Sequence, residues 1–251
     1  MNNALKVAAL ALVCLTPSTT HAGGLVQLEF KLANFSAPLA IDNSLLPLTA
    51  GRHIVYYEVE GDQCVVNDFV VTRSTKHDFR GKYAGLTARV VSDKAWLDKA
   101  CNGGRDLLLE NTVDWHAQDN AGNVWYLGED TTEYFYDDAG HPLGTSKEGS
   151  WEAGRGGAEA GLVMLARPAP GLFYQQEFAP GVAEDAAKVQ KVGVAVSIGL
   201  GDFTGCLVTK ETTALSPGSI EYKSYCPEVG LVLVEVSGNK GGAEAVDLGL
   251  D

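Results

Sequence analysis

The chain has 251 residues, of which 45% are hydrophobic, and a formal net charge of −13. The acidity argues against nucleic acid and anionic membrane surfaces as partners, because phosphate contacts need clusters of Lys and Arg, and the sequence has none. The composition is that of a globular protein with a sizeable core, and 29 glycines suit a fold with many turns.

Residues 1–22 have the features of a secretory signal peptide. Lys6 precedes an apolar run, and small residues lead to an expected cut after Ala22. We therefore expect a mature domain, residues 23–251, in the periplasm or secreted. Removing the peptide removes one Lys and no acid, which leaves 18 basic and 32 acidic residues. No other stretch reaches about 18 apolar residues, so no membrane span is expected.

Four cysteines remain after the expected cut. An even number in an exported chain predicts two disulfides, and three pairings are possible. Proximity in sequence favours Cys64–Cys101 and Cys206–Cys226. Thiolate metal ligands are the alternative, which the lack of any C-x-x-C motif disfavours.

Alternation of apolar and polar residues predicts about twelve strands along the chain. The central feature is a hairpin, Leu107–Tyr136, with its turn at Asp119–Gly122. Only two short pieces are expected to be helical: Ala183–Val189, and a single turn at Asp93–Asp98. The remaining strands are expected at residues 24–32, 52–60, 63–74, 86–91, 173–178, 192–200, 203–212, 219–225, 230–237 and 244–250.

Several long motifs resemble a family of exported bacterial proteins known only as uncharacterised. They are Ile41–Gly51, Asp114–Thr131, Gly149–Gly154, Phe173–Val189 and Cys206–Val232. This resemblance covers most of the mature chain and implies no activity.

The C-terminal strands are also similar to those of LolA-like periplasmic proteins. The similarity lies in G-x-F-x-x-C at Gly201–Cys206 and in IEYKSYCPEVGLV at Ile220–Val232. It implies one antiparallel meander sheet curled into an open half-barrel around an apolar cavity. Together with the strand pattern, we expect a mainly β, single-domain fold with little helix, and a β-sandwich is the alternative.

Candidate functional residues are of two kinds. Polar and acidic side chains of the central hairpin, of the SWEAG segment and of the segment before Pro180-Gly181 could work as general acid and base on a glycoside, or bind Ca²⁺ through oxygen ligands. Aromatic side chains could line a pocket on a concave sheet. Surface solvation and plain core packing are the alternatives. The polar set is Asp114, His116, Glu129, Glu152 and Glu177, and the aromatic set is Trp115, Trp125, Tyr126, Trp151 and Tyr174.

Two rows of side chains are expected to share a face of the hairpin. They are Asp114, His116 and Gln118 before the turn, and Trp125, Leu127 and Glu129 after it.

The favoured function is an exported protein that binds a small hydrophobic molecule in an aromatic pocket, with a cation such as Ca²⁺ as a candidate second ligand. The sequence lacks the nucleophile elbow, zinc-protease, phosphate-loop and dinucleotide motifs, so it assigns no catalytic residue. The alternatives are an extracytoplasmic hydrolase or lyase that uses clustered carboxylates, and a structural or interaction protein of the envelope. The sequence assigns no oligomeric state.

Overall fold

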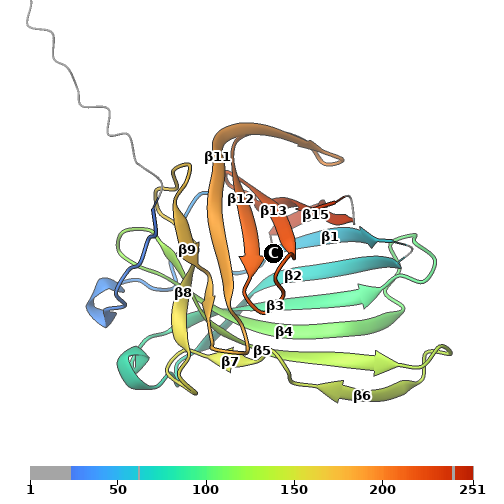
Figure 1. The fold of residues 1–251 in the computed structure, drawn as a ribbon, viewed down its shortest axis with the longest axis horizontal. Coiled ribbons are helices and arrows are strands. Elements are labelled where there is room, and N and C mark those ends of the chain that lie inside the picture. Colours follow the sequence, from blue (N-terminus) through green and yellow to red (C-terminus); the bar gives the residue numbers. More distant parts are fainter. Residues whose placement is uncertain (1–23, 62, 239–240, 251) are drawn as a thin grey trace, which may run out of the picture.

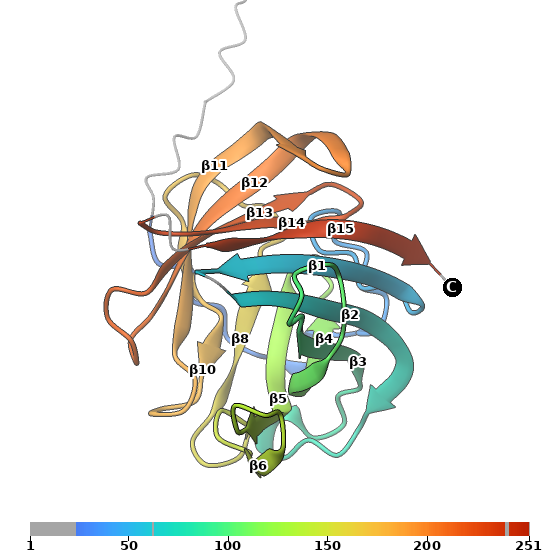
Figure 2. The same ribbon diagram turned by 90° about the vertical axis from the view of Figure 1, so that its right-hand side faces the viewer.

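The computed structural model describes residues 24–61, 63–238 and 241–250. Its strands form one antiparallel sheet, which curls until it is nearly closed into a barrel with one seam (Figures 1 and 2). In the described residues the helical elements are two short 3₁₀ turns, η1 (Leu32–Asn34) and η2 (Gly81–Tyr83). The prediction of a mainly β, curled meander sheet is therefore confirmed, and the curl goes further than a half-barrel.

Over the described residues the sheet has 15 strands. The first seven are β1 (Arg52–Glu60), β2 (Gln63–Lys76), β3 (Ala88–Leu97), β4 (Leu107–Gln118), β5 (Val124–Tyr136), β6 (Pro142–Ser146) and β7 (Trp151–Glu152). The other eight are β8 (Glu159–Met164), β9 (Phe173–Gln175), β10 (Glu177–Phe178), β11 (Asp185–Ile198), β12 (Gly201–Thr213), β13 (Ile220–Cys226), β14 (Gly230–Val236) and β15 (Gly242–Leu250).

Strands that follow one another in the sequence mostly pair with one another in the sheet. One pairing joins distant parts of the chain, and the two ends of the strand order meet at a seam between β9 and β10. The path runs β10-β8-β5-β4-β3-β2-β1-β15-β14-β13-β12-β11-β9, and β6 and β7 also pair with β5. The pairing of β1 with β15 joins the two ends of the chain into one curved wall. The path ends at β9 and β10, which are separated in sequence only by Gln176. The chain itself therefore crosses the seam.

Gly161 on β8 allows the close approach at this seam. A Cβ at this position would lie 2.0 Å from the backbone oxygen of Gln176, which is far inside van der Waals contact. Only a residue without a side chain lets the two backbones meet here.

The long hairpin of β11 and β12 bends over the outside of the barrel. Three register shifts between Val189 and Val196 interrupt its ladder, and such bulges bend a strand. In Figure 1 its tip curls over the top of the sheet. Its apolar side chains pack against the Cys206–Cys226 disulfide. The second disulfide joins Cys64 to Cys101, so both expected pairings are confirmed.

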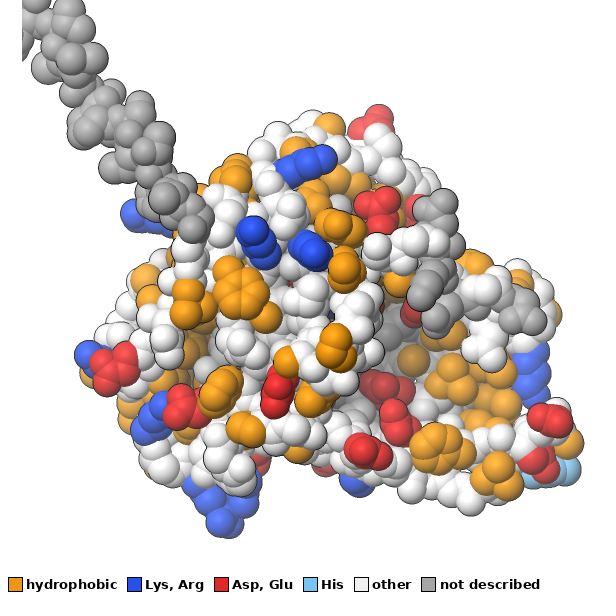
Figure 3. Space-filling model, in the orientation of Figure 1, with side chains coloured by type: hydrophobic (Ala, Val, Ile, Leu, Met, Phe, Trp, Pro, Cys, Tyr) orange, Lys and Arg blue, Asp and Glu red, His pale blue; other side chains and the backbone are white. Residues whose placement is uncertain are grey.

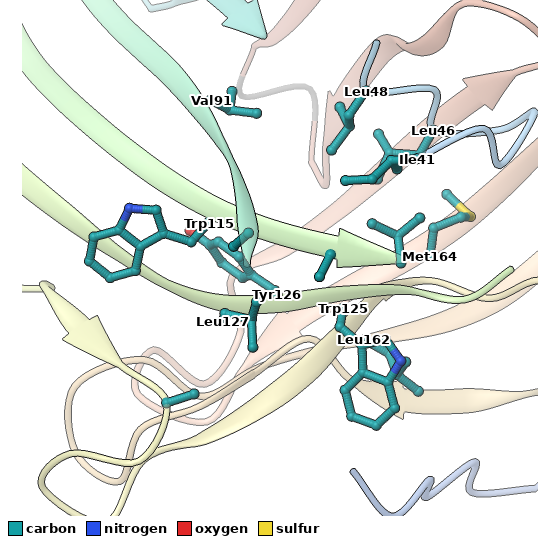
Figure 4. Close-up of a cluster of buried hydrophobic side chains, with 14 of the residues drawn as sticks. Ile41, Leu46, Leu48, Val91, Trp115, Trp125, Tyr126, Leu127, Leu162 and Met164 are labelled. Atoms are coloured by element: carbon teal, nitrogen blue, oxygen red, sulfur yellow. The ribbon is translucent and has the colours of Figure 1, made fainter. Parts of the chain in front are cut away.

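The sheet is buried on both faces around β4 and β5. On the outer face, Phe30, Phe35 and the loop that contains Tyr83 cover Trp125. The ring of Phe30 lies 4.4 Å from that of Tyr83 and 5.6 Å from that of Trp125, measured between centroids. Trp115 and Trp125 point away from each other in Figure 4. Covering both faces explains why burial on these strands no longer alternates.

Three expectations of local structure are wrong. Ala183–Val189 is not helical, since β11 takes up most of it and pairs Ala186 with Gln175 and Ala187 with Glu211. Asp93–Asp98 is largely part of β3. Residues 24–32 form only an isolated bridge between Leu25 and Phe173. In each case, tertiary pairing or the lack of a partner strand overrides local propensity.

The expected signal peptide lies outside the described residues. Among those that are described, no helix has the length and apolar character needed to cross a bilayer.

Candidate functional site

The inside of the curled sheet holds a cavity of about 310 Å³. Most of its wall is apolar. The polar members of the wall are Glu58, Asn67, Asp93, His116, Glu221 and Lys223. Figure 3 shows a hollow right of centre on this side of the molecule, with acidic side chains along its lower edge.

The period of two along each strand decides which residues reach this cavity. On β1 the lining residues are Ile54, Tyr56 and Glu58, and on β2 they are Asn67 and Phe69. On β13 the lining residues are Glu221, Lys223 and Tyr225. Every second side chain of a strand faces the same side, so the curl of the sheet directs these rows inward.

A hydrogen-bonded group of carboxyls lies beside the cavity. The hydroxyl of Tyr126 is 2.5 Å from Asp114 Oδ1 and 2.9 Å from Glu129 Oε2. The tyrosine ring stacks on His116, with 4.8 Å between centroids and 10° between planes. One hydroxyl carries a single proton, so both contacts are hydrogen bonds only when one carboxyl is itself protonated.

The carboxyl pKa values agree with shared protons. Burial, reinforced by neighbouring acids, raises the pKa of Asp114 well above its usual value. The same causes raise the pKa of Asp93 and of Glu129 to about 7. For Glu177, burial and then repulsion from Glu129 and Asp185 raise the pKa to about 8. A buried charge is costly unless it is paired, so much of this group is neutral below these pH values.

Lys223 supplies the opposite charge on the other wall. Its Nζ lies 3.0 Å from Glu211 Oε2 and 3.3 Å from Glu221 Oε2. Burial alone would raise the pKa of Glu211, but the Lys223 ammonium and hydrogen bonds from Thr209 and Gln176 outweigh it and lower that pKa. The pKa of Lys223 is raised because its two acidic partners outweigh burial. Both members of this pair are therefore ionised at neutral pH.

Two polar atoms of the cavity wall lack a hydrogen-bond partner among the described residues. They are Nδ1 of His116 and Oδ1 of Asn67. His116 is only 7% exposed, and burial lowers its pKa to about 3, so its imidazole is neutral. The side chain of Asn67 also hydrogen-bonds Asp93, which opposes the rise in the pKa of that acid.

A bulge decides which hairpin residues face inward. Asp114 pairs with Glu129 and His116 with Tyr126, so β5 has one extra residue between them. Gly128 lies in that stretch with φ of 124°, and a Cβ there would be 2.3 Å from the Trp151 oxygen. The expectation that Trp125 and Glu129 share a face is therefore wrong, because the bulge turns Glu129 to the side of Tyr126.

The structure thus groups five of the ten candidate residues: Asp114, His116, Tyr126, Glu129 and Glu177. Tyr174 is buried nearby, close to Glu211.

The other four candidates do not line the cavity, although the ring of Trp151 packs edge-on against that of Tyr126, with 5.4 Å between centroids. Trp125 donates its Nε1 proton to Asp119 Oδ2 at 2.9 Å in the outer layer. Trp115, Trp151 and Glu152 line a second hollow of about 520 Å³. There Lys76 Nζ lies 4.5 Å from the Trp115 ring centroid and 3.2 Å from Glu152 Oε2.

Sequence reasoning missed Asn67, Asp93, Glu211 and Lys223. They come from four strands, so no short motif contains them. The available signal was a polar or charged residue at an inward position of an otherwise alternating strand.

Replacing Tyr126 with Phe should lower the free energy of unfolding by about 1–3 kcal/mol, because Asp114 and Glu129 lose the hydroxyl between them inside the protein. Urea denaturation at neutral pH measures the change. Tyr134→Phe, on the exposed end of the same strand, is the control. Equal stability of the two variants would show that the hydroxyl does not hold the group together.

The described residues contain no group of three or more His, Cys, Asp and Glu side chains placed to hold a metal ion. The acids of the cavity are spread around its wall. The described residues therefore give no evidence for the Ca²⁺ site considered from the sequence.

The fold and site define a nearly closed, disulfide-bonded β-barrel with an internal cavity. Two disulfides indicate folding in an oxidising, extracytoplasmic compartment.

No family model and no curated protein matches the sequence. Among solved structures, a "putative lipoprotein" from Parabacteroides distasonis is similar, with a TM-score of 0.41 and 12% identity over 82% of this chain and 98% of that one. A likeness at this level identifies neither a family nor an activity. The LolA-like resemblance finds no support in these comparisons.

Proposed function

We propose that this protein binds one small, largely apolar molecule inside the curled sheet. The supporting observation is the cavity of about 310 Å³, whose wall is mainly apolar with a few polar groups. Ligand sites are typically hollows of about 300–1,000 Å³ with this composition. The two disulfides and the pairing of β1 with β15 would keep such a cavity open when no ligand is bound.

The apolar part of the wall comes from three directions. Ile54 and Phe69 belong to β1 and β2, Val234 to β14, and Leu46 and Leu48 to the loop before β1. A molecule inside would be surrounded by side chains from segments far apart in sequence. Burying its apolar surface would stabilise the complex by about 25 cal/mol per Å², less the cost of immobilising it.

Filling the cavity should abolish binding. In Val234→Phe, the larger side chain projects into the cavity, and we expect the affinity for the neutral apolar dye N-phenylnaphthylamine to fall about tenfold or more. Val246→Phe is the matched control, because Val246 is exposed on the neighbouring strand β15. Fluorescence titration measures both, and circular dichroism confirms that each variant is folded. Equal affinities for the dye would place binding outside the cavity and contradict the proposal.

A further inference from the structure

The charges on the cavity wall are unevenly matched. Three carboxyl residues line it, namely Glu58, Asp93 and Glu221, whereas Lys223 is the one basic residue among the described lining residues. Lys223 is already bound by Glu211 and Glu221 on its own side of the barrel. Its charge is therefore matched within the protein, and the wall made by β2, β3 and β4 has no basic side chain in the cavity lining.

That wall also offers hydrogen-bond acceptors with nothing to accept from. Asn67 Oδ1 and His116 Nδ1 are buried without partners. Asp93 hydrogen-bonds the side chain of Asn67, whereas His116 pairs with Arg89, four residues along β3 from Asp93. A neutral imidazole accepts at Nδ1 when its proton is on Nε2. Leaving a buried polar atom unpaired costs free energy, so a ligand that brings N–H donors to this wall gains more than one that does not.

The rest of the lining defines the other end of the ligand. Leu46, Leu48, Phe69, Leu231 and Val234 present only hydrocarbon to the cavity. A molecule that fills the space must therefore combine an apolar body with a donor-rich, positively charged end. A protonated primary amine supplies three N–H donors and one positive charge.

We propose that the cavity selects cationic amphiphiles, in which an apolar body carries a primary ammonium group directed at Asn67 and Asp93. This inference rests on the proposed function and names the ligand class of the same cavity. A carboxylate amphiphile fits poorly, because Lys223 is neutralised by two acids and the remaining polar wall accepts rather than donates.

The test compares three probes with the same hydrocarbon chain and different heads: octylamine, octan-1-ol and octanoate. Each competes with N-phenylnaphthylamine on the purified wild-type protein at about pH 8, where the amine is still protonated. We expect octylamine to bind about tenfold more tightly than octan-1-ol, and octanoate to bind most weakly. In Asp93→Asn the advantage of the amine over the alcohol should shrink to about twofold. Asp130→Asn, an exposed acid that pairs with Lys147, should keep it.

A pH series adds a second readout. Asp93 has a raised pKa of about 7, so near pH 6 it is mostly protonated and attracts an ammonium group less. The advantage of octylamine over octan-1-ol should therefore fall as the pH drops from about 8 to 6, whereas the alcohol alone should bind similarly. Other groups also interact with Asp93. Asn67 forms a hydrogen bond with it, and the groups that interact with it through their charges are Tyr56, Asp68, Glu110, Asp114, Glu129 and Lys223.

The possible outcomes distinguish an error in the ligand class from an error in the proposed binding function. Equal binding of amine and alcohol, or an amine advantage that survives in Asp93→Asn, would overturn the ligand class and leave the binding function standing. Tighter binding of octanoate would overturn it in favour of an anionic head at Lys223. No competition by any of the three probes would contradict both the ligand class and the proposed cavity.

Discussion

Lys223→Met should lower the free energy of unfolding by about 3–5 kcal/mol, because it leaves Glu211 ionised and unpaired inside the barrel. The side chain of Glu211 is 8% exposed, and Lys223 is the partner that most lowers its pKa. Met retains much of the volume of the lysine stem, so the loss reports mainly on charge. Urea denaturation near pH 7.5 measures it, and Lys147→Met, at the exposed pair with Asp130, should cost less than about 1 kcal/mol.

A second substitution tests the cause. Adding Glu211→Gln removes the unpaired charge, and the double variant should recover more than half of the lost stability. Lowering the pH should act in the same direction on the single variant, because Glu211 can then take up a proton. If the double variant is as unstable as Lys223→Met, the lysine acts through packing and not through its charge.

The architecture could be anticipated because its cause is local. Alternation of side chains specifies strands and their faces, so a mainly β fold could be predicted from the pattern, and the spacing of the cysteines favoured both disulfides. The curl of the sheet was expected only from the LolA-like resemblance. Local composition fails to predict the structure at Ala183–Val189. Its composition favours helix, yet pairing with β9 and β12 on both sides makes it part of the sheet.

The site could be anticipated only in part. The sequence singled out Asp114, His116 and Glu129 as polar groups of the hairpin and Glu177 as an acid beside the Pro180-Gly181 break. The structure brings these four together. The bulge at Gly128 that turns Glu129 inward has no signal in the alternation pattern. Asp93 and Lys223 reach the same interior from strands 130 residues apart in the numbering, and only the closure of β1 onto β15 brings them to one cavity. Long-range pairing of this kind leaves no short-range pattern.

The unfolding free energy should fall as the pH rises from about 6.5 to 8.5. The carboxyls of Asp93 and Glu129 have a raised pKa of about 7 in the folded protein, and Glu177 one of about 8, whereas unfolded carboxyls titrate near 4. The folded state therefore holds protons that the unfolded state has already lost. The stability contributed by these groups is fully present below the unfolded pKa and is lost as the pH rises through the folded pKa.

Each such proton contributes a slope of about 1.4 kcal/mol per pH unit, so the combined loss over this window should be about 3 kcal/mol. His116 has the opposite sign, because its lowered pKa of about 3 means that the unfolded chain binds its proton near pH 6. Its effect is largely complete above about pH 7, since an unfolded histidine titrates near 6.5. Starting the series at pH 6.5 thus isolates the carboxyls.

Glu177→Gln removes the carboxyl whose pKa is raised to about 8. The amide cannot ionise, so this variant should lose less stability than the wild type between about pH 7 and 8.5, and its curve should run flatter by about one proton. Glu184→Gln is the matched control, because Glu184 lies on the exposed side of the same segment, where it accepts a hydrogen bond from the Gly181 amide at 2.7 Å. Chemical denaturation at four or five pH values gives the curves. A wild-type stability that rises with pH across this window would mean that the interior carboxyls are ionised and stabilised as anions, and the shared-proton description of Asp114, Tyr126 and Glu129 would then be wrong.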